Sequence, residues 1–451
     1  MTPSIFRRVV HLAWPVLVAQ LAVVGSGVID TVMAGRLSAL DLAAVGVGAA
    51  IYITVFMTAM GVLMALTPTV AQHYGAGRYK EIGEDVRQCA WLALLLAIAG
   101  TLLLRHPEPF IALAQLTPAM EAKVRAYLAA ISWGIAPGLA FRIFYGFMSG
   151  IGRPRAIMAF NLIGLAAKVP LNALYMVELG MGATGCGAST ATISWLSAIL
   201  AWSWCARQAD CAAYGVLSRL TFPKPRAMFE LARLGLPIGL TLLVDVTAFT
   251  FMALFIARLG PTMSAAHQVA ANLTILVFMI PLSIGHASLV LVGHALGAGD
   301  PATARHTGLI GIAFGLAVSS LVACGLWLGA EQIAALYTPD VEVRAVAAGL
   351  IAIIAAYHLI DALQTVVVNI LRGYKRTVVP MAVYVVSLWG IGLGGGYVLG
   401  LTDLLGRARG AAGFWLAATA SLLLAGLLVL VYFLIVAQTT IRQNQLKTPS
   451  S

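Results

Sequence analysis

Three aspartates lie inside long apolar stretches of this sequence, where a charged side chain is not an ordinary solvated surface group. Asp30, Asp245 and Asp361 are each flanked on both sides by mostly aliphatic residues. The other fourteen of the 17 acidic residues lie in polar segments or at their edges. If the apolar stretches cross a bilayer, each central carboxylate costs about 2.5–3.5 kcal/mol on insertion scales. Such residues indicate an ion or substrate path.

Hydroxyl-bearing residues accompany two of these aspartates at helical spacing. Tyr357 lies four residues before Asp361 and Thr365 four residues after it, so the three share one helix face. Thr241 lies one turn before Asp245. Oxygen ligands suit a hard cation such as Na⁺, and the same carboxylates could instead carry protons. We predict a cation-coupling site formed by Asp245, Asp361 and Tyr357, which would also be the ligands if the ion is Na⁺.

Two basic residues, Arg142 and Lys168, also lie inside apolar stretches, and each could form a structural ion pair with an aspartate. Both are in the same half of the chain as Asp30, so this alternative stays open for Asp30. Two bases cannot neutralise three acids, and the second half has no buried base. Asp245 and Asp361 are therefore the main candidate site.

The composition places most of the chain in lipid. Of its 451 residues, 61% are hydrophobic and 10% are charged, against roughly 45–50% and about 25% in soluble domains. Because a span needs about 20 apolar residues, we predict an all-α polytopic membrane protein with twelve transmembrane helices. The predicted spans are 9–35, 43–70, 88–104, 123–149, 156–177, 184–206, 229–257, 264–291, 306–328, 343–371, 378–401 and 408–437.

The net charge of +11 follows from membrane topology and does not indicate a nucleic-acid partner. With the N-terminus placed inside, eighteen Lys and Arg residues fall on the cytoplasmic side and eight on the other. This bias sets orientation, so both termini are expected in the cytoplasm. The five cysteines show no metal or disulfide spacing. The sequence also lacks a GxxxxGK[ST] phosphate-binding loop and an HExxH motif, and we expect neither a cofactor nor enzyme activity.

The two halves of the sequence repeat one another. A shift of 222 places Pro15 on Pro237 and Gly77 on Gly299, and a shift of 221 further along places Gly152 on Gly373. Six spans per half give both halves the same orientation, so we predict two six-helix lobes related by a parallel pseudo-two-fold repeat. The predicted domains are an amino-terminal lobe (1–206), a cytoplasmic linker (207–228), a carboxy-terminal lobe (229–437) and a cytoplasmic tail (438–451).

Several segments resemble signatures of the multidrug and toxic compound extrusion (MATE) family, closest to its bacterial norfloxacin-exporter branch. They are IDTVMAG at 29–35, GVLMALTPTVAQHYGAG at 61–77, AAHQVAANLTILVFMIPLSI at 265–284 and LRGYK at 371–375. The resemblance covers nearly the whole chain in order. It implies a two-lobed antiporter that exports amphipathic organic cations in exchange for Na⁺ or H⁺. We also expect the chain to act as a monomer in the bacterial inner membrane.

The resemblance also assigns site residues. The family's acidic positions in the first, seventh and tenth helices fall on Asp30, Asp245 and Asp361, and glutamate is usual at the second of these. The tyrosine before the tenth-helix aspartate falls on Tyr357. A polar cluster of the amino-terminal lobe, a substrate or ion site, is expected from Asp30 together with Asn172 and Thr190. Lys168 stands at a position where asparagine is common in this branch. We therefore include Lys168 in the expected polar cluster and note that it departs from the family's pattern.

Two rival functions remain at this point. A flippase for lipids or lipid-linked oligosaccharides has a related architecture, but its phosphate-bearing substrate favours a basic cavity, and this sequence buries more acids than bases. An intramembrane aspartyl protease would need a pair of aspartates. Neither Asp245 nor Asp361 has the Tyr-Asp or Gly-x-Gly-Asp context of those enzymes, which disfavours this reading.

Overall fold

The structure is a computed structural model that describes residues 4–114, 116–218 and 221–447. Every regular element in these residues is helical, which confirms the predicted fold class. The elements are α1 (Ile5–Leu37), α2 (Ala39–Leu63), α3 (Leu66–Gly75), α4 (Tyr79–Arg105), α5 (Glu108–Ala114), α6 (Pro118–Ser132), α7 (Ile135–Gly150), α8 (Pro154–Asn172), the π-helix η1 (Ala173–Glu178), α9 (Ala183–Arg207), α10 (Ala209–Ala212), α11 (Pro225–Ala257), α12 (Pro261–Gly297), α13 (Pro301–Leu328), α14 (Ala330–Tyr337), α15 (Val341–Gly373), α16 (Val378–Val385), the π-helix η2 (Val386–Gly394), α17 (Gly395–Leu401) and α18 (Ala411–Lys447).

Each of the twelve predicted spans coincides with a helix or a run of joined helices. Ten of these in the described residues are long and apolar enough to cross a membrane, and the pair α6–α7, bent by 47°, gives an eleventh. The remaining predicted span, 184–206, coincides with α9, whose 25 residues reach about 37 Å at 1.5 Å per residue but are not among the helices that are apolar enough to count as a span. Ser189 and Thr190 are among the polar residues that α9 carries.

The chain forms two compact units. Unit 1 comprises Met1–Leu17 and Thr241–Ser451, and unit 2 comprises Val18–Leu240. Helices α1 and α11 therefore each contribute to both units. The lobe boundaries at 206/207 and 228/229 stay a prediction. Residues 219–220 of the predicted linker and 448–451 of the predicted tail lie outside the described residues, and the helix α18 continues to Lys447.

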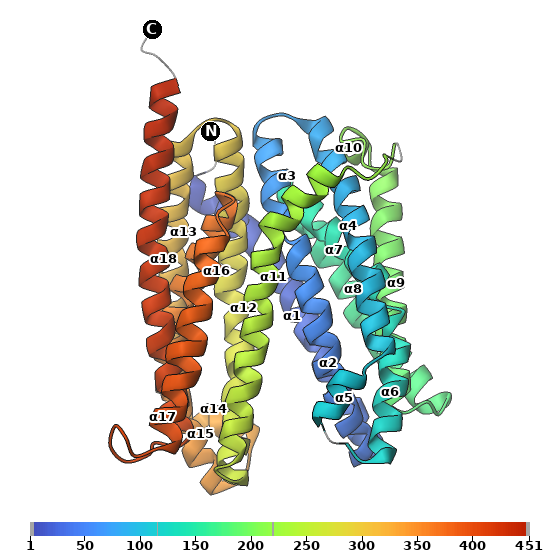
Figure 1. The fold of residues 1–451 in the computed structure, drawn as a ribbon, viewed down its shortest axis with the longest axis vertical. Coiled ribbons are helices and arrows are strands. Elements are labelled where there is room, and N and C mark those ends of the chain that lie inside the picture. Colours follow the sequence, from blue (N-terminus) through green and yellow to red (C-terminus); the bar gives the residue numbers. More distant parts are fainter. Residues whose placement is uncertain (1–3, 115, 219–220, 448–451) are drawn as a thin grey trace. The chain divides into compact units, whose positions relative to one another are not determined.

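Unit 1 is built on α12, α13, α15 and α18, which pack side by side (Figure 1). Trp415 of α18 is fully buried at the centre of one apolar cluster. The first part of α1 packs into a second cluster through Val9, and the ring of Phe6 meets Phe314 edge-on at 5.0 Å. The start of α1 and the end of α18 lie at the same end of this unit (Figure 1).

Unit 2 is built on α2, α4 and α6 to α9 (Figure 1). Phe144 is fully buried and packs against Phe160 and Trp202. The first part of α11 lies against α2 at a glycine: a Cβ at Gly235 would stand 1.9 Å from the carbonyl oxygen of Val62. Only glycine permits this approach of two helix backbones.

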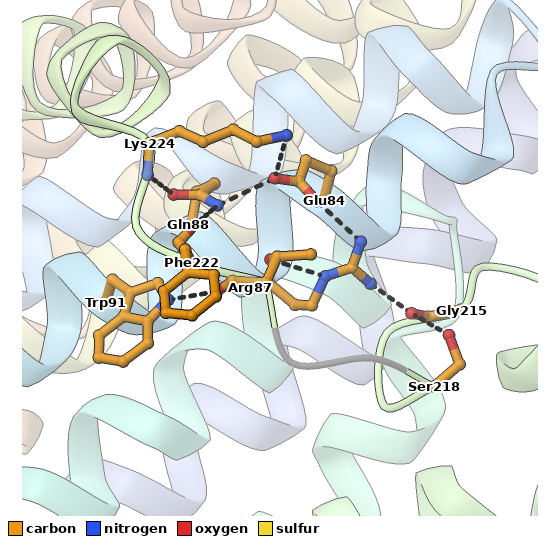
Figure 2. A network of polar contacts seen from close by, with 9 residues as sticks. Glu84, Arg87, Gln88, Trp91, Gly215, Ser218, Phe222 and Lys224 are labelled. Carbon is orange, nitrogen blue, oxygen red and sulfur yellow. Dashed lines mark hydrogen bonds and ion pairs between the residues drawn. The ribbon is translucent and has the colours of Figure 1, made fainter.

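In the segment between α9 and α11, the described residues Gly215, Thr221, Phe222 and Lys224 are held against α4 (Figure 2). Arg87 Nε donates to Thr221 Oγ1 at 3.2 Å, and Arg87 Nη1 donates to the carbonyl oxygen of Gly215. The indole nitrogen of Trp91 donates to the carbonyl oxygen of Thr221 at 2.9 Å. Two of these three contacts reach backbone carbonyl oxygens of the segment.

The same segment is held again just before α11 begins (Figure 2). Gln88, which is fully buried, donates to the carbonyl oxygen of Phe222 at 3.0 Å and accepts from the backbone N–H of Lys224 at 2.7 Å. Glu84 accepts from Gln88 at 2.9 Å and pairs with the ammonium of Lys224 at 3.0 Å. The start of α11 is thereby fixed to unit 2.

The turns of the structure test the register of the sequence repeat. Gly77 and Gly299 both have left-handed φ angles, of 69° and 76°, and their backbone hydrogen bonds match at a shift of 222. The second register is wrong: the left-handed partner of Gly152 is Lys375, at a shift of 223, and Gly373 is an ordinary helical residue. Matching glycine to glycine misled the alignment, because a lysine occupies the left-handed position in the second copy.

Candidate functional site

The two aspartates of the main candidate site come from α11 and α15 of unit 1. Asp245 accepts a hydrogen bond of 2.6 Å from the hydroxyl of Tyr384, which lies on α16. Asp361 is buried and accepts from Thr365 Oγ1 at 3.3 Å, as expected for residues one turn apart. Thr365 also lies 3.3 Å from Gln364 Oε1. Each carboxylate therefore has a hydroxyl donor.

The two carboxylates lie close enough to interact electrostatically, and Tyr357 lies within range of both. Within the described residues, neither carboxylate has a Lys or Arg nitrogen within 4.0 Å. The structure thus brings together the three residues predicted for cation coupling. It leaves the carboxyl groups of Asp245 and Asp361 without a basic partner from the described part of the chain.

Several buried polar atoms near Tyr357 lack a hydrogen-bond partner among the described residues. The ring of Tyr357 meets Trp415 edge-on at 5.4 Å, and His267 lies 5.8 Å from the same indole. The indole nitrogen of Trp415, Nδ1 of His267 and both ring nitrogens of the neighbouring His358 are unpartnered. Because buried polar atoms are normally satisfied, this part of unit 1 is suited to water, an ion or a polar ligand.

The residues predicted for the amino-terminal lobe also lie together, in unit 2. Lys168 is fully buried on α8, and its ammonium lies 2.8 Å from Asp30 Oδ1 and 2.6 Å from Thr190 Oγ1. Asn172, one turn further along α8, donates to the same oxygen of Asp30 at 2.8 Å. The ion pair that the sequence left open for Asp30 is therefore formed. Arg142 does not take part, since its guanidinium lies over the ring of Tyr145 at 4.2 Å.

Sequence reasoning missed two partners. Tyr384 is 139 positions away from Asp245, and nothing in its surrounding sequence marks it. Ser189 is fully buried, accepts from Lys168 at 3.3 Å and donates to Asn172 Oδ1. Its place beside Thr190 in an apolar span was a usable signal, because adjacent hydroxyls in such a span commonly face other helices.

Two comparisons decide the family. The family model MatE matches residues 15–174 and 237–398, one copy in each half and most of the chain in total. The chain belongs to the MATE family. NorM of Aromatoleum aromaticum, a probable multidrug resistance protein, is 42% identical over 94% of this chain and 93% of its own length. The multidrug resistance protein PmpM of Pseudomonas aeruginosa is 37% identical, over 97% and 93%.

Solved MATE structures share the fold. A MATE protein in the straight conformation superposes with a TM-score of 0.89 over 98% of both chains, at 16% identity. The eukaryotic MATE transporter AtDTX14 gives 0.86 over 97% of this chain and 98% of its own. At these identities the likeness concerns the fold alone, so the roles of single residues in this MATE protein rest on its own geometry.

No group of three or more His, Cys, Asp or Glu side chains in the described residues is arranged to hold a metal ion. A Na⁺ ion bound at Asp245 and Asp361 would therefore need hydroxyl, amide, carbonyl or water oxygens as its further ligands. Tyr357, Thr365 and Gln364 carry such groups close to Asp361.

Proposed function

We propose that this MATE protein is a secondary active multidrug efflux transporter, which exports amphipathic organic cations by antiport with Na⁺ or H⁺. The observation that carries the proposal is the pair of neighbouring carboxylates in unit 1, Asp245 and Asp361, without a basic partner in the described residues. Relatives named multidrug resistance proteins support the drug substrate. A buried, unpaired negative charge attracts any cation that reaches it, whether drug, Na⁺ or proton.

Competition for these carboxylates provides the coupling. A drug cation drawn from the cytoplasmic side is released outside when Na⁺ or H⁺ takes its place at Asp245 and Asp361. The hydroxyls of Tyr384 and Thr365 orient the two carboxylates, and Tyr357 supplies a further oxygen. Coupling requires that each ligand bind the outward-facing and inward-facing states unequally.

The coupling ion is tested in proteoliposomes that contain the purified chain and report ethidium movement by fluorescence. An imposed Na⁺ gradient and an imposed pH gradient are applied separately. Antiport predicts that one of them drives ethidium against its own gradient. If neither gradient drives ethidium or another organic cation, the proposal is wrong.

Asp361→Asn tests the site itself, because asparagine keeps the shape and removes the charge. We expect the initial rate of gradient-driven efflux to fall at least about tenfold, which corresponds to about 1.4 kcal/mol. Asp403→Asn is the matched control, because Asp403 is exposed in the loop before α18. The Asp403→Asn variant should export ethidium at the same rate as the unmodified chain. Undiminished efflux by Asp361→Asn would remove Asp361 from the mechanism.

The transporter is proposed to act as a monomer in the bacterial inner membrane with both termini in the cytoplasm. The excess of Lys and Arg on that side supports this orientation. Phosphatase and fluorescent-protein fusions at the carboxy terminus test it, since only a cytoplasmic end gives fluorescence without phosphatase activity. The two acids without basic partners disfavour a phosphate-bearing flippase substrate, and the twofold repeat favours alternating access over proteolysis.

A further inference from the structure

Lys168 lies at the centre of the polar cluster in unit 2, and its hydrogen bonds use all of its protons. Its side chain is 1% exposed. The ammonium lies 2.8 Å from Asp30 Oδ1, 2.6 Å from Thr190 Oγ1 and 3.3 Å from Ser189 Oγ. A lysine ammonium has three protons to donate, so these three oxygens complete its coordination.

The groups around the ammonium also satisfy one another. The hydroxyl of Ser189 donates to Asn172 Oδ1, and Asn172 Nδ2 donates to Asp30 Oδ1 at 2.8 Å. The ring of contacts therefore runs from Lys168 through Ser189 and Asn172 to Asp30 and back to Lys168. Thr190, outside this ring, donates to the carbonyl oxygen of Cys186 at 3.1 Å. A carboxylate, two hydroxyls and an amide thus surround a single positive charge.

We propose that Lys168 is a resident cation that permanently fills this site, so that Asp30 binds neither the coupling ion nor the cationic drug. The inference rests on the proposed antiport function and narrows it to the carboxylates of unit 1. A free cation that approached Asp30 would compete against an ammonium tethered to the same helix bundle, which has the advantage of an intramolecular ligand. It would also have to leave Lys168 charged and unpaired in a buried place, which is strongly unfavourable.

The contrast with unit 1 gives the consequence for transport. Asp245 and Asp361 have hydroxyl donors but no Lys or Arg partner in the described residues, so they can take a mobile cation. Asp30 already has its cation within the chain. The coupling ion and the drug should therefore exchange in unit 1 alone, and Lys168 is the residue that determines this restriction.

The first test removes the charges of the pair singly and together. Asp30→Asn and Lys168→Met each leave a buried charge without its partner, whereas the double variant leaves none. We expect each single variant to lower the melting temperature of the purified protein, and the double variant to recover it. The double variant should transport ethidium at a rate within about twofold of the unmodified chain, with the same ion dependence, because neutral replacement of both partners is often tolerated.

Lys123→Met is the matched control for loss of a lysine from an ion pair. Lys123 pairs with Asp41 at 2.6 Å, but its side chain is 37% exposed, so its removal should cost less. The proposal is overturned if the double variant is folded, with a melting temperature close to that of the unmodified chain, and yet loses transport or changes its ion dependence. Asp30 would then take part in transport directly.

The second test leaves Lys168 and Asp30 unmodified. It therefore shows whether Asp30 binds an external cation even if the double variant of Asp30 and Lys168 does not fold. Asp245→Asn and Asp361→Asn are combined to silence unit 1, and thermal stability is measured with rising NaCl, LiCl or ethidium, with choline chloride holding the ionic strength constant. We expect no ligand-dependent rise in melting temperature. A rise that disappears when Asp30→Asn is added would show that Asp30 binds an external cation despite Lys168.

These measurements separate the inference from the proposed function. If the unmodified chain moves no organic cation under either gradient, the antiport proposal fails. The melting temperatures still report whether Lys168 fills the site, because they require no transport.

Discussion

Replacing Gln88 with methionine should weaken the attachment of residues 222–224 to α4. Methionine has nearly the same length but cannot form the three hydrogen bonds of the Gln88 amide, which join it to Glu84, the carbonyl of Phe222 and the N–H of Lys224 (Figure 2). The bond to the carboxylate of Glu84 contributes about 1.5–3 kcal/mol and each of the others about 0.5–1.5 kcal/mol.

The net effect is smaller than that sum. Glu84 keeps Arg87 at 2.9 Å and Lys224 at 3.0 Å, so most of its stabilisation is retained. The two backbone groups lose their partner at a position where Gln88 itself is fully buried. We expect the free energy of local opening at residues 222–224 to fall by about 2–3 kcal/mol. The population of the open state should then rise roughly 30- to 150-fold.

Hydrogen–deuterium exchange of a peptide that covers 221–226 measures this directly, because the N–H of Lys224 is one of the bonded groups. Its exchange should accelerate by that factor, with little change in α12, which lies in unit 1. Gln332→Met is the matched control, since Gln332 is exposed on the short helix α14. If the Lys224 amide exchanges equally in Gln88→Met and the unmodified chain, the segment is not held by Gln88 and the reasoning is refuted.

Three further substitutions test other parts of the structure. Gly235→Ala should abolish the folded detergent-solubilised fraction on size exclusion, because its Cβ would meet a backbone oxygen at 1.9 Å, whereas Gly46→Ala, with nothing within 4 Å, should be tolerated. Asp300 caps α13, and hydrogen bonds from the Thr303 side chain and N–H lower the pKa of its carboxyl. Asp300→Ala should therefore lower the free energy of unfolding by about 1 kcal/mol at neutral pH. Because the folded pKa of Asp300 lies below its unfolded value of about 4, this difference should persist above pH 4 and shrink as the pH falls below 4 through the folded pKa. Tyr384→Phe removes the 2.6 Å bond that orients Asp245 and should raise the coupling-ion concentration for half-maximal efflux by about tenfold; an unchanged value would contradict that role.

The fold was largely predictable because a bilayer restricts the chain to long apolar helices. The mean composition and the spacing of apolar stretches predicted twelve spans, and each coincides with a helical segment. The short helices α5 and α14 and the π-helical turns η1 and η2 were not predicted. The helices α5 and α14 have only 7 and 8 residues, too few to cross a bilayer, and the change of hydrogen-bond pattern in η1 and η2 leaves no signal in hydrophobic periodicity.

The candidate site was predictable where chemistry alone marked the residue. An aspartate in a span is conspicuous, and so is a lysine such as Lys168. A tyrosine such as Tyr384 or a glutamine such as Gln88 is unremarkable until the fold brings a partner from more than 130 positions away. The contacts of Gln88 also run to backbone groups, whose positions side-chain identities do not reveal.

The two halves share a backbone but not their charges, and this asymmetry is independent of the fold. At the shift of 223 that the turns establish, Tyr357 and Asp361 correspond to Gly134 and Gly138 in the bent pair α6–α7. Gly138 is packed closely against Phe56, so a carboxylate has no room there. Asp30 likewise corresponds to Met252 when the prolines of α1 and α11 are aligned. Since no acid recurs at an equivalent position, the repeat dictates the architecture only. Which half exchanges cations must then depend on individual residues that differ between equivalent positions of the two halves. The most important of these is Lys168, which pairs with Asp30.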